Sequence, residues 1–310
     1  MNGHSASQRL TVIVPHYNSP RTLERLIASI PCRDWIEIVV VDDNSSEPIG
    51  ALLDARPNVR LLQLPEGRKG GGAARNFGLE HSDGEWLLFA DADDFFVDGA
   101  FDKVAEYLPS TLDIVYFSPT SLQESTGKTG ARHRHYESLL HAYAQRADKS
   151  LLYRYFVPWS KLVSRRLIEE NSISFDEVIA SNDMNFSLKV AFHGRTHAVD
   201  MRPIYCVTES GASLTKQVSA AVLESRFHAV VRYNRFLRTH GQGRYQIGIN
   251  LQLYNMRHLG LRRVMKHLAY SIRNRMPLFR GLKPLARQIL RDIRGRYAAP
   301  ATKEMQDALP

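Results

Sequence analysis

The sequence predicts an α/β fold in which a mainly parallel sheet is flanked by helices, followed by a basic, helical C-terminal extension. Three observations predict it: apolar runs without polar alternation, helical periodicity between those runs, and a change of charge along the chain. The 310 residues are 44% hydrophobic and 24% charged, which is typical of globular proteins and excludes disordered and collagen-like chains. We therefore expect one domain over residues 1–215 and a separate extension over residues 216–310.

Apolar runs mark the strands of the sheet. Each run has hydrophobic residues at consecutive positions rather than at every second position. Strands of this kind are buried on both faces, as they are in parallel sheets. The expected strands cover residues 10–18, 36–43, 59–64, 85–90 and 113–117.

Segments with helical periodicity separate these strands. In the first segment, Leu23, Leu26 and Ile27 fall on one side of a helix, as packing against a sheet requires. Strands that alternate with helices across short links favour a doubly wound arrangement. The expected helices cover residues 22–30, 49–55, 72–81 and 101–108.

The rest of the chain is less regular. Residues 123–150 are polar and are expected to form a mobile connection with one helix. Residues 132–135 alternate arginine and histidine, but no cysteine or carboxylate accompanies them, so a solvated loop is preferred to a metal site. Residues 151–215 show a mixed α/β pattern, and the chain from residue 219 onward is expected to be helical.

Several classes of protein are excluded by what the sequence contains. Cys32 and Cys206 are too few for a disulfide framework or a four-cysteine zinc site, and we expect both to be buried, reduced thiols. Residues 1–9 contain no apolar signal-peptide core, and no apolar run approaches the ~18 residues that span a membrane. We expect a cytoplasmic protein.

Polar clusters follow three of the predicted strands, at residues 15–18, 42–46 and 91–94. The carboxyl ends of parallel strands meet at one edge of a sheet, where ligands of open α/β folds bind. Aspartates gathered there would repel one another unless a divalent cation offset their charge, and oxygen ligands suit Mg²⁺ or Mn²⁺. The alternative is that they cap the helices that follow. The aspartates are Asp42, Asp43, Asp91, Asp93 and Asp94.

A glycine-rich segment, residues 68–76, lies between the third and fourth predicted strands. Three consecutive glycines lead into a helix, with Lys69 and Arg75 on either side. Backbone N–H groups at a helix N-terminus bind phosphate, and either cation would add charge. Because the segment matches neither the P-loop nor the dinucleotide-binding pattern, a plain flexible loop stays open as the alternative.

Together these residues resemble the N-terminal half of family 2 glycosyltransferases of the GT-A fold, which is Rossmann-like. A weaker resemblance continues through residues 158–162 and 165–171 to the bacterial surface-polysaccharide branch (capsule, O-antigen, exopolysaccharide), and it fades after Thr215. The motifs are Pro15-x-Tyr17-Asn18, Val41-Asp42-Asp43-x-Ser45, Gly72-x-Ala74-Arg75-Asn76-x-Gly78 and Leu88-x-x-Asp91-Ala92-Asp93-Asp94.

The resemblance implies a site for a nucleotide-diphosphate sugar, with UDP as the most frequent nucleotide. Asp43 would accept a hydrogen bond from the base, with Tyr17 packing near it and Pro15 shaping the turn. Arg75 would meet the base or the diphosphate. The implied donor-binding residues are Pro15, Tyr17, Asn18, Asp43, Lys69, Arg75, Asp91 and Asp93.

Asp91 and Asp93 would form the family's D-x-D element and hold Mn²⁺ or Mg²⁺. Asp93 is the implied direct metal ligand, and Asp91 would lie nearer the ribose or the donor sugar. A divalent cation there would take the charge of the leaving diphosphate.

The family's catalytic base matches the stretch at residues 181–188. Asp183 occupies the position of the base, which would deprotonate the acceptor hydroxyl, whereas Asn182 replaces the usual glutamate. A plain helix N-cap is the alternative for Asp183. The acceptor-side candidates are Trp159, Lys161, Asn182 and Ser213, the last in an element at residues 209–213 that lacks the family's arginine.

The implied enzyme is an inverting, metal-dependent glycosyltransferase that uses a glycan or polyprenyl-diphosphate-linked acceptor. Residues 1–120 would form the nucleotide-sugar half of the catalytic domain and residues 121–215 the acceptor half. Two other readings stay open. A catalytically inactive GT-A-like binding protein would keep the same fold. A sugar-phosphate nucleotidyltransferase would need a glycine-rich loop after the first strand, where residues 15–18 stand instead.

The extension is strongly basic. Residues 216–310 contain 19 basic and four acidic residues, within an overall net charge of +9. For residues 257–296, with 12 basic residues and one acidic residue, we expect a pair of helices lying on an anionic membrane surface. The alternative is packing on the catalytic domain, and nucleic acid is not an expected partner. The expected location is the inner face of the cytoplasmic membrane. The apolar stripes are Leu261, Val264, Met265, Leu268, Ala269, Ile272 and Met276, then Leu282, Leu285, Ile289 and Ile293.

Overall fold

The computed structural model describes residues 10–50, 56–209 and 219–297. The chain divides into two compact units, Met1–Gln217 and Val218–Pro310. The helix expected at residues 49–55 lies almost wholly outside the described residues, as does Ser213.

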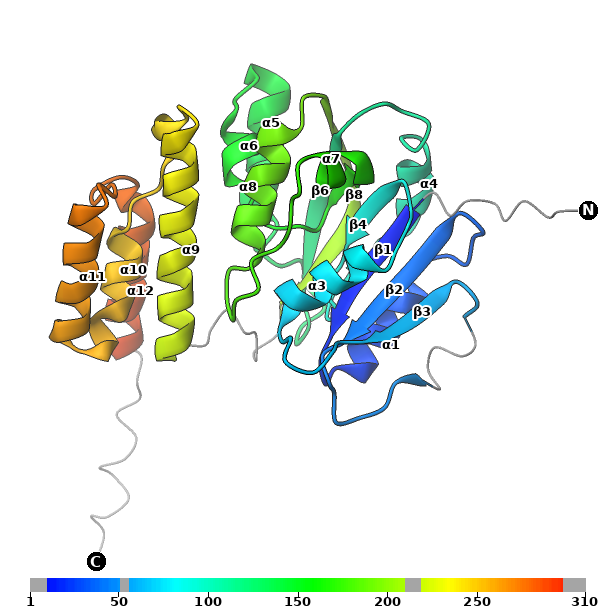
Figure 1. The fold of residues 1–310 in the computed structure, drawn as a ribbon, viewed down its shortest axis with the longest axis horizontal. Helices are drawn as coiled ribbons and strands as arrows, with labels where there is room; N and C mark the ends of the chain where they lie inside the picture. The colour runs from blue at the N-terminus through cyan, green and yellow to red at the C-terminus, as the bar shows by residue number, and fades with distance from the viewer. Residues whose placement is uncertain (1–9, 51–55, 210–218, 298–310) are drawn as a thin grey trace, which may run out of the picture. The chain divides into compact units, whose positions relative to one another are not determined.

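The described part of unit 1 is built on an eight-stranded sheet with the order β3-β2-β1-β4-β7-β6-β8-β5 (Figure 1). Parallel pairs join β1 to β2 and β4, β2 to β3, and β6 to β8, whereas β7 and β5 pair antiparallel with their neighbours. The mainly parallel α/β sheet predicted from the apolar runs is confirmed. Its strands are β1 (Leu10–His16), β2 (Ile36–Asp42), β3 (Val59–Gln63), β4 (Trp86–Phe89), β5 (Phe95–Phe96), β6 (Ile114–Gln123), β7 (Lys161–Ser164) and β8 (His197–Glu209).

The register brings the predicted polar clusters to one edge of the sheet. His16, the last residue of β1, lies opposite Asp42, the last residue of β2. On the other side of β1, Ile13 lies opposite Phe89 at the end of β4. The loops that follow these three strands therefore leave the sheet on the same side, which is the arrangement that the sequence predicts.

Helices cover both faces of the sheet. α1 (Pro20–Ala28) and α4 (Ala100–Ala105) pack on the face that carries Val12 and Val14. The opposite face, which carries Ile13, is covered by helices that follow β3, β6 and β7. These helices are α3 (Gly71–Glu80), α5 (Arg134–Arg146), α6 (Ser150–Arg154), α7 (Arg165–Glu170) and α8 (Asp183–His193).

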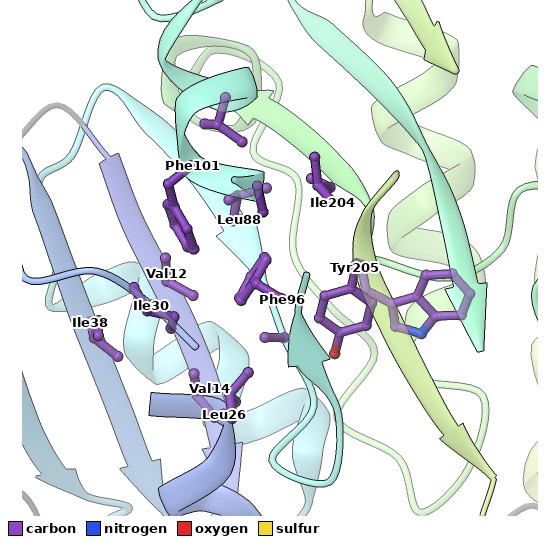
Figure 2. Packing of buried hydrophobic residues seen from close by; sticks show 14 of the residues in the cluster. Val12, Val14, Leu26, Ile30, Ile38, Leu88, Phe96, Phe101, Ile204 and Tyr205 are labelled. Carbon is purple, nitrogen blue, oxygen red and sulfur yellow. The ribbon is translucent and has the colours of Figure 1, made fainter. Parts of the chain in front are cut away.

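Figure 2 shows the core between the sheet and α1. Val12 and Val14 of β1 lie near Leu26 of α1 and Ile30, which follows this helix, and all four side chains have 0% exposure. Neighbouring residues of a strand point to opposite faces, so Ile13 joins the other core. The predicted apolar face of the first helix is confirmed.

Three details differ from the prediction. β3, at the edge of the sheet, is partly exposed and not buried on both faces. Cys32 is exposed, because it stands in the turn between α1 and β2 and not within either element; Cys206 is buried in β8. Residues 132–135 are not wholly solvated, since His133 is 8% exposed and its Nδ1 lies 2.7 Å from the Ser121 hydroxyl. The segment between β6 and α6 contains the expected single helix, α5.

The described part of unit 2 is helical, as predicted for the chain from residue 219 onward. α9 is capped by Ser219, whose hydroxyl accepts from the backbone N–H of Val222. α10 contacts each of the other three α-helices of the unit. Among the described helices, none combines the length and apolar character needed to cross a membrane. The elements are α9 (Ala220–Thr239), η2 (Gly243–Tyr245), α10 (Asn250–Asn255), η3 (Met256–Leu259), α11 (Leu261–Arg273) and α12 (Leu282–Tyr297).

Candidate active site

The loops after β1 and β2 are joined by hydrogen bonds. His16 Nδ1 lies 3.0 Å from Asp42 Oδ1, and Ser45 donates to the same carboxylate. Burial would raise the pKa of Asp42, but the hydrogen bonds from Ser45 and His16 outweigh burial and lower this pKa. Asn18 Oδ1 accepts from the Ser46 backbone N–H at 2.8 Å. Asp42 and Asn18 thus hold the two loops together.

Asp43 lies between these loops and the start of α3. Its Oδ2 accepts a hydrogen bond of 2.8 Å from the backbone N–H of Gly70. Gly70 has φ 90°, a conformation that favours glycine, and it is the residue before the first turn of α3. Tyr17, which follows β1, is 56% exposed, and the Lys69 side chain is also exposed.

A close backbone approach positions α3. A Cβ atom on Gly72 would lie 2.3 Å from the carbonyl oxygen of Asp176, so only glycine lets the helix meet this segment. The contact holds α3 against the residues that lead into α8. It also places Arg75 of α3 beside Asn182, the residue that precedes Asp183.

Arg75 links two parts of the predicted site: Asp91, which follows β4, and Asn182, which precedes α8. This side chain is buried; its Nη2 donates to Asp91 Oδ1, and its Nη1 donates to Asn182 Oδ1 at 3.2 Å. The guanidinium also lies over the ring of Phe175, 5.4 Å from its centroid. The Nε atom of Arg75 is buried and has no hydrogen-bond partner among the described residues. The guanidinium therefore bridges the residue before Asp183 and the carboxylate cluster that follows β4.

Asp91, Asp93 and Asp94 form a tight carboxylate cluster, with oxygens within 4.8 Å of one another. Loss of solvation, followed by the charge of Asp91, raises the pKa of Asp93. The same two causes, with Asp93 added, raise the pKa of Asp94. This excess of negative charge fits a hard divalent cation, for which each of the three carboxylates offers an oxygen ligand. Of the five aspartates expected together, Asp42 and Asp43 lie outside this cluster. Asp42 is bound by His16 and Ser45, and Asp43 accepts from the Gly70 backbone N–H.

Asp183 is the first residue of α8 and is partly buried. Burial raises the pKa of its carboxyl, and the charge of Asp91 adds to this effect. The charges of Arg75 and Lys161 oppose it. A carboxylate with a raised pKa is better matched to accepting a proton near neutral pH. The first turn of α8 therefore presents a suitable base next to the carboxylate cluster.

Comparison with known families shows which family the chain belongs to. Residues 11–171, more than half of the chain, match the family described as glycosyl transferase family 2. The chain belongs to this family. The family and the GT-A fold that the four motifs predicted are both confirmed.

Two relatives of this family 2 member are bacterial. The putative glycosyltransferase EpsH of Bacillus subtilis is 24% identical over 229 residues, which are 70% of this chain and 65% of EpsH. The poly(ribitol-phosphate) beta-N-acetylglucosaminyltransferase TarS of Staphylococcus aureus is 26% identical over 237 residues, 72% of this chain and 39% of TarS. The chain thus spans less than two thirds of the length of either relative.

Solved structures show the same fold. TarS 1–349 in complex with UDP-GlcNAc aligns with a TM-score of 0.61 and 22% identity, over 73% of this chain and 66% of that one. The mannosyltransferase PcManGT from Pyrobaculum calidifontis, in complex with GDP-Man and Mn²⁺, aligns with a TM-score of 0.56 and 19% identity. The alignment covers 94% of this chain and 81% of that one.

Two acceptor-side candidates of this family 2 member are buried. Trp159 is 2% exposed and stacks on Tyr205, with ring centroids 5.8 Å apart. Lys161 is 1% exposed; its Nζ donates to the Ser187 hydroxyl at 3.0 Å and to the Tyr155 carbonyl at 3.3 Å. Side chains this deeply buried do not present themselves to an acceptor in this conformation. A supporting role beneath the site is the better interpretation for both.

Sequence reasoning missed several supporting residues. The Tyr205 hydroxyl accepts from the Asp91 backbone N–H at 2.8 Å and donates to the Asp94 carboxylate. Arg25 donates to the Asp93 carbonyl at 2.6 Å. Glu209 Oε1 accepts from the backbone N–H groups of residues 131 and 132. No local pattern marks these residues, because each acts on a segment far away in the sequence.

Proposed function

We propose that this family 2 member is an inverting, metal-dependent glycosyltransferase that moves a sugar from a UDP-sugar to a hydroxyl of a lipid-linked or growing polysaccharide. The observation that carries the proposal is the bridge formed by Arg75 between Asp91 and Asn182. This bridge joins the carboxylate cluster suited to the donor diphosphate and the turn that presents Asp183. The UDP-GlcNAc complex of TarS and the GDP-Man complex of PcManGT support a nucleotide-sugar donor.

The donor would lie along the edge formed by β1, β2 and β4. Asp43 would accept a hydrogen bond from the base, and the exposed ring of Tyr17 would pack against it. Lys69 and Arg75 would contribute positive charge toward the diphosphate. Pro15 and Asn18 would hold the loop that lies beneath the nucleotide base.

Asp91 and Asp93 would hold Mn²⁺ or Mg²⁺, with Asp93 as the direct ligand. The raised pKa of Asp93 and the closeness of the cluster fit such an ion. The Mn²⁺ complex of PcManGT gives further support. When bound, the ion supplies positive charge for the leaving diphosphate.

Asp183 would take the proton of the acceptor hydroxyl. The acceptor oxygen then forms a bond to the anomeric carbon while the bond from that carbon to the diphosphate breaks on the opposite side, which inverts the configuration. The charges of Arg75 and Lys161 oppose the effect of burial on Asp183, and burial still leaves its pKa raised. Asn182 stands where the resemblance implies a glutamate, and its neutral amide oxygen accepts a hydrogen bond from Arg75.

The acceptor and the location of the enzyme follow from the surface-polysaccharide resemblance. We infer that residues 1–120 bind the donor and residues 121–215 the acceptor, a glycan or a polyprenyl-diphosphate-linked glycan. The name of TarS, with poly(ribitol phosphate) as its substrate, supports a cell-surface polymer. An acceptor carried by lipid would place this enzyme at the inner face of the cytoplasmic membrane, with residues 257–296 on the anionic surface.

Calorimetry of the whole chain with UDP, GDP and dTDP, each with and without Mn²⁺, tests the donor site. We expect UDP to bind most tightly and only with Mn²⁺, and Asp93→Ala to lose the Mn²⁺-dependent affinity. Asp98→Ala is the matched control, because Asp98 is an exposed aspartate outside the cluster. Metal-dependent affinity that is unchanged in Asp93→Ala would contradict the proposed ligand.

The variant Asp183→Asn tests whether Asp183 is the catalytic base. We expect turnover to fall by about 10²–10⁴-fold, the usual contribution of a positioned general base, while UDP binding is retained. Radiolabelled transfer to membrane-extracted acceptor gives turnover, and calorimetry gives binding. Near-normal turnover would remove Asp183 from the mechanism.

A further inference from the structure

α11 leaves three large apolar residues exposed, whereas Val264 and Leu268 of the same predicted stripe are partly buried. Its buried residues are polar: Ser271 is 0% exposed and His267 is 7% exposed, with the His267 ring 4.6 Å from that of Phe227 in α9. The Ser271 hydroxyl donates to the His267 carbonyl, so the buried side of the helix satisfies its own polar groups.

The exposed side of α11 carries the large apolar residues. Leu261 is 75% exposed, Met265 53% and Ile272 59%. They are separated by four and seven residues, so they lie in one line along the helix. We call these three residues the apolar ridge. A surface helix normally turns such a line toward the core, because exposing it forgoes the free energy of burial.

Basic residues border the ridge on one side. Arg262, Lys266 and Arg273 each follow a ridge residue by one position, about 100° further around the helix. All three are exposed, and α11 contains no acidic residue. The exposed surface of this helix is therefore an apolar line with positive charge along its border.

We propose that the apolar ridge inserts into the interface of an anionic phospholipid bilayer, with Arg262, Lys266 and Arg273 at the level of the lipid headgroups. This inference refines the membrane association that forms part of the proposed function, and it assigns that association to one face of one helix. A helix of 13 residues is about 20 Å long, too short to cross a hydrocarbon core of about 30 Å, so it would lie in the plane of the membrane.

Charge and apolar area together favour this occupant over others. A nucleic acid would use the basic border but leave the ridge in water. A second copy of the chain would bring two basic borders together, and like charges repel. Anionic lipid satisfies both features. Unit 2 has three further exposed apolar residues outside α11: Phe279, Leu282 and Leu290.

Sedimentation of the whole protein with vesicles tests the proposal. We expect retention on phosphatidylcholine vesicles that contain phosphatidylglycerol, little retention on phosphatidylcholine alone, and weaker retention at high salt. The triple variant Leu261→Ser, Met265→Ser, Ile272→Ser should bind at least tenfold more weakly. Leu61→Ser, which changes an exposed leucine of β3 in unit 1, is the matched control and should bind as wild type does.

A charge variant separates the two contributions. Arg262→Gln, Lys266→Gln, Arg273→Gln should lose the preference for phosphatidylglycerol. Ridge variants that bind as wild type does would overturn the proposal in favour of adsorption by charge alone, and failure of the wild type to bind anionic vesicles would overturn it outright. UDP binding by the same proteins reports on the donor site separately, so failure of the ridge and failure of the proposed enzyme are distinguishable.

Discussion

α1 and α11 carry similar apolar stripes. α1 buries its stripe, whereas α11 leaves several residues of its stripe exposed. In α1, Leu23 and Leu26 are 0% exposed and lie against the sheet. In α11, Leu261 and Ile272 are exposed, and Ser271 is buried instead. An apolar stripe therefore predicts a helix and tells which residues share a face, but it does not tell whether that face meets the core of the protein or an external partner.

Leu26→Ala should have the largest effect on stability. Its side chain is enclosed by Val12, Val14 and other members of the core (Figure 2), so truncation leaves a cavity. We expect the free energy of unfolding to fall by about 2–5 kcal/mol, measured by urea denaturation. A loss under about 1 kcal/mol, which would match a surface site, would break the contrast between the two helices.

Lys161→Met extends the comparison to α8, which like α11 buries a polar contact. In α8 this contact is the hydrogen bond from Lys161 to Ser187. Burial lowers the pKa of Lys161 from 10.5 to about 7, although the charge of Asp183 opposes this. At pH values between about 7 and 10.5, the unfolded chain binds more protons at this lysine than the folded chain does. Titration of Lys161 therefore makes the free energy of unfolding rise with pH. Thermal unfolding of wild type and variant from pH 7 to pH 9 measures this dependence.

The variant lacks this pH dependence. Its stability relative to wild type should therefore become less favourable as pH rises, by at most about 1.4 kcal/mol per pH unit. Lys128→Met, at an exposed lysine, is the control and should show no such trend. If the stability difference between Lys161→Met and wild type stays constant with pH, then Lys161 keeps an ordinary pKa.

Ile272→Ser should have the smallest effect on stability. The side chain is 59% exposed, so its removal should change the free energy of unfolding by no more than about 0.5 kcal/mol. Urea denaturation under the conditions used for Leu26→Ala allows a direct comparison. A loss of 2 kcal/mol or more would show that α11 buries its apolar side in solution, which would remove the basis for the apolar ridge.

Much of unit 1 could be predicted because its information is local. Consecutive apolar residues mark strands buried on both faces, and short contiguous motifs place Asp43, Asp91 and Asp93 directly after those strands. The supporting contacts could not be predicted. Tyr205 reaches Asp91 across 114 residues of sequence, and Arg25 reaches Asp93 across 68 residues, through pairings that only the folded sheet creates.

The sequence by itself determined the family, the mainly parallel sheet and the edge at which the polar loops gather, because each depends on residues close together in the chain. Only the tertiary structure decided how charge is distributed at the site. It placed Arg75 between Asp91 and Asn182, and it buried Lys161 beneath α8. It also decided which side of α11 faces outward, because burial depends on what a folded chain places against each face of a helix.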